Sequence, residues 1–268
     1  MGKRSVLWVH GLTGRFTGDV KTMNLLAEAC IQKGMAFASF NNRGHDIISS
    51  IRKVDPNAAT GMTHVTIGAG MEEFSESVFD IDAGVSFLVS RGYTEVVLAG
   101  HSTGANKVCY YAANTKDPRV IGVILAGPIS DRLSERTDKV RYDENMKIVR
   151  ELIDSDKGEG LLTKIHWFPL SARRAWSLLG PNTKEDVFNY GDEKNVLETF
   201  HNITSPVLIV LSGSDEAADR PVTEIRKVFD EHTGAKNYRS VIIPDATHGY
   251  KDKEKEFVDA VVSWSAAL

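Results

Sequence analysis

Short apolar runs alternate with longer amphipathic stretches along most of the chain. The runs are continuous rather than alternating, which is typical of strands buried on both faces of a parallel sheet. We expect strands at residues 6–9, 36–40, 96–99, 120–125, 206–211 and 240–243.

The stretches between these runs predict helices. The clearest one places Phe74, Val78, Ile81, Val85 and Leu88 on one face, with a spacing of 4, 3, 4 and 3. Further helices are expected at residues 20–32, 102–113, 221–229 and 254–265, and a loop at about 41–70. This order predicts an α/β fold, with a mostly parallel sheet of about six strands and helices on both faces.

Residues 131–201 interrupt the alternation, because they contain helical patterns but no convincing strand. Met146, Val149 and Ile153 would share one helix face, and a second helix is expected at 171–179. The segment is too long for a plain connection between two strands. We therefore expect a core of residues 1–130 and 202–268, with a helical cap inserted at 131–201.

The composition of the chain argues against nucleic acids and membranes as partners. The 268-residue chain has a formal net charge of -4, which offers no basic surface to nucleic acid. No apolar run approaches the roughly 18 residues of a membrane span, and the first run fits a strand better than a signal peptide. Cys30 and Cys109 are too few for a disulfide framework. They favour buried, reduced thiols in a cytoplasmic protein.

The residues that follow the expected strands carry the candidate chemistry, since ligands of open parallel sheets bind beyond the carboxyl ends of strands. Ser102 follows one strand within Gly-His-Ser-Thr-Gly, Asp215 follows another, and His248 follows the last. This is the chain order Ser, Asp, His of one class of catalytic triad.

The position of Ser102 between an expected strand and an expected helix explains the glycines on either side of it. A serine at a sharp strand-to-helix turn is strained, and flanking glycines remove the clashes that side chains would cause there. His248 would take the serine proton, and Asp215 would orient the imidazole and stabilise its cation. The backbone N–H groups of Leu12 and Thr103 would stabilise an oxyanion, each typically contributing about 3 kcal/mol.

Other residues compete for these roles. Asp131 follows the preceding strand and Glu216 adjoins Asp215, so both are alternatives for the acid. The remaining histidines lack the spacing of metal ligands, and neither Gly-rich segment completes a phosphate-binding motif. We therefore expect no metal and no cofactor.

The chain resembles the α/β-hydrolase superfamily from its first expected strand to its last helix. Residues 40–46 (FNNRGHD) and 105–108 (ANKV) resemble a branch that includes siderophore esterases. Residues 10–14 (HGLTG) are similar to the corresponding loop of cinnamoyl and feruloyl esterases. The resemblance implies hydrolysis of a carboxylic ester through an acyl-enzyme.

One feature departs from that family, which usually begins with two further strands. Only about five residues precede the first strand here, so the chain is expected to be either naturally short or truncated at its front. The strand at 36–40 would then be an uncovered edge of the sheet.

Large side chains in the expected cap offer a substrate pocket. Trp167, Phe168 and Trp176 could line an aromatic acyl or alcohol site, although a cap must also pack on the core. We expect a small-molecule ester as substrate and a monomer or homodimer. A thioesterase, a peptidase, a carbon–carbon hydrolase or a slow-turnover sensing protein would be compatible with the same fold.

Overall fold

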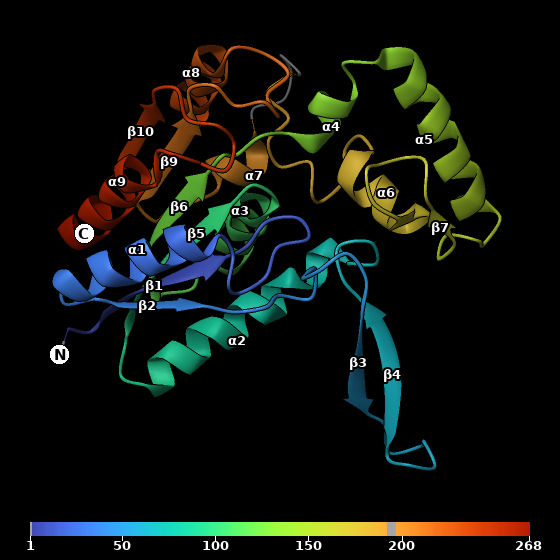
Figure 1. Cartoon of the computed structure of the whole chain (residues 1–268), viewed down its shortest axis with the longest axis horizontal. Helices are drawn as coiled ribbons and strands as arrows, with labels where there is room; N and C mark the ends of the chain where they lie inside the picture. Colours follow the sequence, from blue (N-terminus) through green and yellow to red (C-terminus); the bar gives the residue numbers. More distant parts are fainter. Residues whose placement is uncertain (1, 192–196) are drawn as a thin grey trace.

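A six-stranded sheet forms the centre of the computed structural model, which describes residues 2–191 and 197–268 (Figure 1). The strand order is β10-β9-β6-β5-β1-β2, and every neighbouring pair is parallel. Its strands are β1 (Arg4–Val9), β2 (Ala36–Ser39), β5 (Glu95–His101), β6 (Val120–Ala126), β9 (Val207–Ser212) and β10 (Tyr238–Ile243). The predicted fold class is confirmed, and β2 lies at an edge of this sheet.

The two faces of the sheet are covered by different helices. On one face lie α1 (Val20–Gln32) and α9 (Glu254–Ala267). On the other lie α2 (Ser77–Ser90), α3 (Thr103–Thr115), α7 (Glu198–His201) and α8 (Val222–His232), with a short 3-10 helix, Phe74–Glu76, before α2. No helix in the described ranges has the length and apolar character that crossing a membrane requires.

The continuous apolar runs explain this layering. In β1, Leu7 and Val9 pack with α2 and α3, whereas Val6 and Trp8 pack with α1 and α9. Because successive side chains of a strand point to opposite faces, both faces need apolar residues when both are covered. Cys30 and Cys109 are buried and free, on opposite faces.

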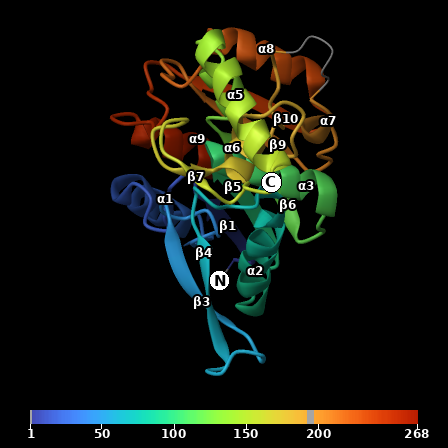
Figure 2. The ribbon, with the colours of Figure 1, turned by 90° about the vertical axis from the view of Figure 1, so that its right-hand side faces the viewer.

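The prediction of a loop at about residues 41–70 is wrong in part, because a β-hairpin forms within this range. Strands β3 (Ser49–Val54) and β4 (Met62–Ile67) pair antiparallel and extend away from the central sheet (Figures 1 and 2). Most residues of β3 are exposed, and Val54 is 71% exposed. With polar and apolar residues exposed alike, the sequence lacks the pattern by which a half-buried strand is recognised.

The segment between β6 and β9 contains helices at both places where the sequence suggested them, around residues 146–153 and 171–179. It contains α4 (Asp131–Glu135), α5 (Lys139–Asp154), α6 (Ala172–Leu179) and, near its end, α7. The expectation that it holds no strand is corrected by a two-residue ladder between β7 (Leu161–Leu162) and β8 (Leu170–Ser171). Residues 192–196 of the predicted cap lie outside the described residues, and the proposed division into core and cap stays a prediction.

The helices α5 and α6 share a small apolar core of their own. Its centre contains Met146 and Val149 of α5 with Ala175 and Leu178 of α6. The segment is therefore packed internally as well as against the rest of the protein.

Buried ion pairs connect α6, in the segment between β6 and β9, to α3, which packs on the central sheet. Lys107 of α3 lies 2.6 Å from Glu72, and both side chains are 1% exposed. Arg174 of α6 lies 3.5 Å from Glu72 and also forms a forked ion pair with Glu185, with one N–O distance of 3.0 Å. Because an isolated buried charge is costly, each member of this group depends on its partners.

Candidate active site

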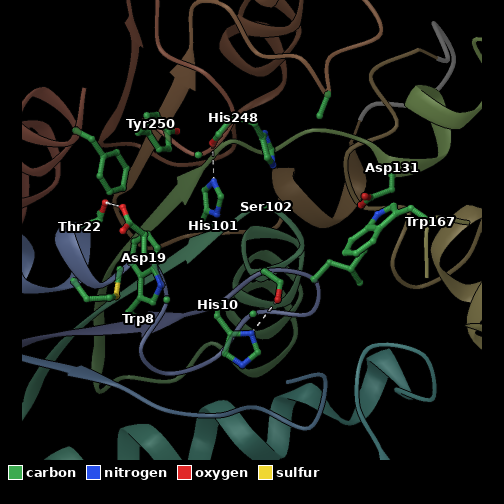
Figure 3. Close-up of a pocket in the computed structure, with 18 residues that line it drawn as sticks. Trp8, His10, Asp19, Thr22, His101, Ser102, Asp131, Trp167, His248 and Tyr250 are labelled. Atoms are coloured by element: carbon green, nitrogen blue, oxygen red, sulfur yellow. Dashed lines mark hydrogen bonds between the residues drawn. The ribbon is translucent and has the colours of Figure 1, made fainter. Parts of the chain in front are cut away.

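A pocket of about 450 Å³ opens at the carboxyl ends of the central strands. Figure 3 shows Ser102 between Asp131 and Trp167 on one side and Trp8, Asp19 and Thr22 on the other. Further lining residues are His10, Gly11, Leu12, Gly14, Gly18, Met23, His101, Ala217, His248, Gly249, Tyr250 and Phe257. Ser102, His248 and Leu12 of the predicted site therefore line one pocket.

Ser102 lies at the junction of β5 and α3 with a positive φ of 56°. This backbone conformation is unfavourable for a non-glycine residue and is typically found where the surrounding structure enforces it. The Ser102 N–H donates to the carbonyl of Ala126 at 2.9 Å, which fixes the turn against β6.

Close backbone contacts explain the glycines around the serine. A Cβ atom on Gly100 would lie 2.2 Å from the carbonyl oxygen of Gly104, and one on Gly104 would lie 2.2 Å from that of Val9. A Cβ atom on Gly11 would lie 2.9 Å from Cβ of Ser102. Side chains at these positions would push apart the turn and the loop that faces it.

His248 contacts Asp215 directly. Its Nδ1 atom lies 2.9 and 3.0 Å from the two carboxylate oxygens, and the Asp215 side chain is 0% exposed. The N–H of Ala217 also donates to Asp215, at 3.0 Å. Burial acts to lower the pKa of His248, but the hydrogen bond and charge of Asp215 outweigh it, and the pKa is raised.

His101 and Glu216 hold the loop that carries His248, a role that the sequence does not predict for either residue. His101 Nε2 donates to the carbonyl of His248 at 2.8 Å, and their rings are 5.0 Å apart (Figure 3). The N–H of His248 donates to Glu216 at 2.8 Å. Glu216 was considered as the acid, but it contacts the backbone of His248, whereas Asp215 contacts its ring.

The loop after β1 is held by His10. Its Nδ1 donates to the carbonyl of Gly11 at 2.9 Å, and its Nε2 accepts from the N–H of Asn42 at 3.2 Å. Burial, followed by the charge of Lys107, lowers the pKa of His10 to about 4. The ring is therefore neutral near pH 7, which agrees with one nitrogen donating and the other accepting.

Leu12 and Thr103 lie on the two segments that meet beside Ser102. Leu12 lines the pocket, and Thr103 is the first residue of α3, where backbone N–H groups are not used within the helix. Their predicted role as oxyanion donors stays a prediction.

No direct hydrogen bond joins Ser102 to His248 in the described part of the chain. Both side chains face the same pocket, and such bonds are often long in free enzymes and shorten when substrate binds.

Asp131 lies elsewhere on the pocket wall, at the start of α4 (Figure 3). Burial and then the charge of Glu185 raise its pKa to about 7, although the residue is partly exposed to the pocket. The contact with the imidazole of His248 belongs to Asp215.

The three aromatic residues predicted to bind substrate have different surroundings. Trp167 lines the pocket and is 69% exposed. Phe168 is 2% exposed and packs with α5 and α6, and Trp176 packs against the same core beneath Arg150. Phe168 and Trp176 do not line this pocket, so their positions favour packing over substrate contact.

No three His, Cys, Asp or Glu side chains among residues 2–191 and 197–268 are grouped in a way that could hold a metal ion.

The arrangement of strands and helices is that of the α/β-hydrolase fold. The structure is similar to Est1E from Butyrivibrio proteoclasticus with bound ferulic acid, at 20% identity and a TM-score of 0.64, covering 98% of this chain and 89% of that one. It is also similar to the siderophore hydrolase EstB from Aspergillus fumigatus, at 19% identity and a TM-score of 0.61, covering 99% and 90%.

Sequence comparison places the chain in one family of narrower definition than the α/β-hydrolase fold. The chain belongs to the family described as DUF1749, a protein of unknown function, whose model matches residues 61–265. It is 26% identical over 217 residues to the UPF0613 protein PB24D3.06c of Schizosaccharomyces pombe, covering 70% of this chain and 68% of that protein.

Proposed function

We propose that this protein is a serine hydrolase that cleaves a carboxylic ester through an acyl-enzyme. The observation that carries the proposal is the convergence on one pocket of a strained serine and a histidine paired with a buried aspartate. This combination supplies a nucleophile, a base and a group that orients the base.

In the first step, Ser102 Oγ attacks the ester carbonyl carbon while its proton passes to His248 Nε2. The backbone N–H groups of Leu12 and Thr103 stabilise the negative charge on the carbonyl oxygen. The tetrahedral intermediate then expels the alcohol, which takes the proton from His248. Water repeats the sequence on the acyl-enzyme, releasing the acid and restoring Ser102.

The similar structures favour an ester over other acyl substrates. One was solved with ferulic acid bound, and another is described as a siderophore hydrolase. A thioesterase, a peptidase or a carbon–carbon hydrolase would use the same triad. A substrate panel that differs only in the scissile bond separates these activities.

The decisive experiment compares Ser102→Ala with the unaltered protein on p-nitrophenyl acetate. Activity should fall by roughly 10³- to 10⁶-fold, as when a triad nucleophile is removed from a serine hydrolase. Ser90→Ala on the remote helix α2 is the matched control and should retain activity. Equal activity in both variants would refute the role of Ser102.

A protein that binds esters with little turnover is the second class to test. Labelling of Ser102 by a fluorophosphonate and burst release of p-nitrophenol would indicate an enzyme. The expected cytoplasmic location and monomeric or dimeric state stay predictions.

A further inference from the structure

The charge of the pocket wall restricts the substrates that it can accept. Among its described lining residues are two carboxylates, Asp19 and Asp131, and no lysine or arginine. Asp19 is already engaged, since it caps α1 and accepts a hydrogen bond from the Thr22 hydroxyl at 2.8 Å. Asp131, the first residue of α4, lies on the same side of the pocket as Trp167 (Figure 3).

The histidines of the wall do not offset this negative charge. Burial lowers the pKa of His10 and of His101 to about 4, so that both are neutral near pH 7. His248 must also be neutral to accept the proton of Ser102. The active form of the pocket therefore contains no cationic side chain among its described residues.

Neighbouring arginines are matched by other acids. Arg174 pairs with Glu185 and Glu72, Arg132 pairs with Asp186 at 3.0 Å, and Arg220 pairs with Asp219 at 2.8 Å. Asp131 is not the ion-pair partner of any of these arginines. Burial raises its pKa to about 7, so the residue is ionised above neutral pH.

Trp167 lies on the same side of the pocket as Asp131, and its indole is largely uncovered (Figure 3). Indole faces attract organic cations through the quadrupole of the ring, and a nearby carboxylate adds charge attraction. The pair differs from a metal site, because one carboxylate and one indole supply too few oxygen or nitrogen ligands.

We propose that Asp131 and Trp167 form a subsite for an alkylammonium group, so that the preferred ester carries a positive charge in its acyl or alcohol part. This inference rests on the proposed function, because it assigns part of the same pocket to substrate selection. Esters with a carboxylate at that position would be disfavoured, since the described wall offers no lysine or arginine to pair with it.

A binding measurement tests the subsite without requiring turnover. Choline and 3,3-dimethylbutan-1-ol have nearly the same shape but differ in charge, and both are titrated into the Ser102→Ala protein at about pH 8.5, where Asp131 is ionised. We expect choline to bind at least about tenfold more tightly, which corresponds to about 1.4 kcal/mol. Asp131→Asn in the same background should abolish most of this preference.

Two variants separate the subsite from the general charge of the pocket. Asp19→Asn removes a carboxylate from the opposite side and retains a capping oxygen, so the preference for choline should persist. Trp167→Leu should reduce the preference, whereas Trp167→Phe should retain part of it. Equal binding of the two alcohols, or a preference unchanged by Asp131→Asn, would overturn the proposal.

Hydrolysis of acetylcholine and 3,3-dimethylbutyl acetate by the unaltered protein gives a separate readout. A ratio of kcat/KM that favours acetylcholine and falls in Asp131→Asn supports the subsite. If p-nitrophenyl acetate is not hydrolysed, the proposed function fails, while choline binding still decides the subsite. If p-nitrophenyl acetate is cleaved but choline has no advantage, only the subsite fails.

Discussion

The backbone of Ser102 shows how individual residues make an unfavourable turn possible. Its positive φ is held between β5 and α3, where Gly100 and Gly104 allow close backbone contacts. Conformations of this kind cost about 1–3 kcal/mol and must be maintained by their surroundings. Small changes at the glycines should therefore disturb both stability and catalysis.

Substituting Gly104 by alanine tests this requirement. The new Cβ atom would meet the carbonyl oxygen of Val9, so we expect a loss of about 1–3 kcal/mol in unfolding free energy and a large loss of the proposed esterase activity. Gly249→Ala is the control for stability, because a Cβ atom there has nothing within 4 Å. Urea unfolding of both variants provides the comparison, and equal stability would contradict the steric explanation.

The roles of the two acidic residues near His248 lead to different pH profiles. Asp215→Asn should reduce kcat by roughly 10⁴-fold, because asparagine no longer fixes the imidazole tautomer that leaves Nε2 free to accept a proton and does not stabilise the imidazolium. Asp131→Asn should cause a far smaller loss. It should also shift the acidic limb of activity to lower pH, because the Asp131 charge contributes to the raised pKa of His248.

The direction of this shift in the pH profile follows from the protonation state of His248 that the proposed mechanism requires. In the proposed mechanism, activity requires neutral His248 and is lost as the pH falls through its pKa, so a lower pKa extends activity toward acid. A pH series of kcat/KM for both variants checks this. A greater loss in Asp131→Asn than in Asp215→Asn would exchange their assignments.

The sequence led to Ser102, Asp215 and His248 because each follows a recognisable strand. It did not lead to the support given by His101 and Glu216, whose bonds go to the backbone of His248. Such bonds depend on how two loops approach one another, and neither residue type nor spacing encodes that approach.

At the scale of the elements, neighbouring side chains in the segment between β6 and β9 have different roles. Trp167 is exposed in the pocket, and Phe168 is buried against α5 and α6. Trp167→Ala should change unfolding free energy by less than about 0.5 kcal/mol, because the indole is exposed. Phe168→Ala should cost about 3–5 kcal/mol, since its side chain lies in the core formed with α5 and α6.

Substrate preference should show the reverse order. Acetate, longer and aromatic esters are compared in the Trp167→Ala and Phe168→Ala proteins at a temperature where both are folded. Trp167→Ala should change the ratios between esters, by amounts typical of the roughly 1–3 kcal/mol available from a single pocket contact. Identical ratios in both variants would show that this segment does not select the substrate through Trp167.

The strands and helices around the central sheet were predictable because they are covered. Residues 20–32 were expected to form a helix and do form α1, since burial on one face imposes a helical period. The β3–β4 hairpin was not predicted, because little of it is buried and no face had to be apolar. The exposed strands therefore carry less information in their sequence than the buried ones.

At the scale of the whole molecule, the charges around Glu72 connect α3 to α6. Glu72→Gln would leave Lys107 without its ion pair and weaken the surroundings of Arg174, so we expect a loss of about 3 kcal/mol in unfolding free energy. Glu95→Gln, which breaks the partly exposed pair with Arg4, should cost less than about 1 kcal/mol. Similar losses of unfolding free energy in the two variants would show that the buried ion pairs of Glu72 contribute no more to stability than the partly exposed pair of Glu95.

The β3–β4 hairpin also has a consequence for motion. Its twelve cross-strand positions, from Ser49 to Ile67, are paired mainly with one another rather than with the central sheet. Amide protons in such a unit can exchange with solvent deuterium through local opening, whereas those in β5 and β6 require much larger openings. The protein should therefore have two populations of exchange rates. Denaturant at low concentration should accelerate the slow population while leaving the hairpin's rates nearly constant.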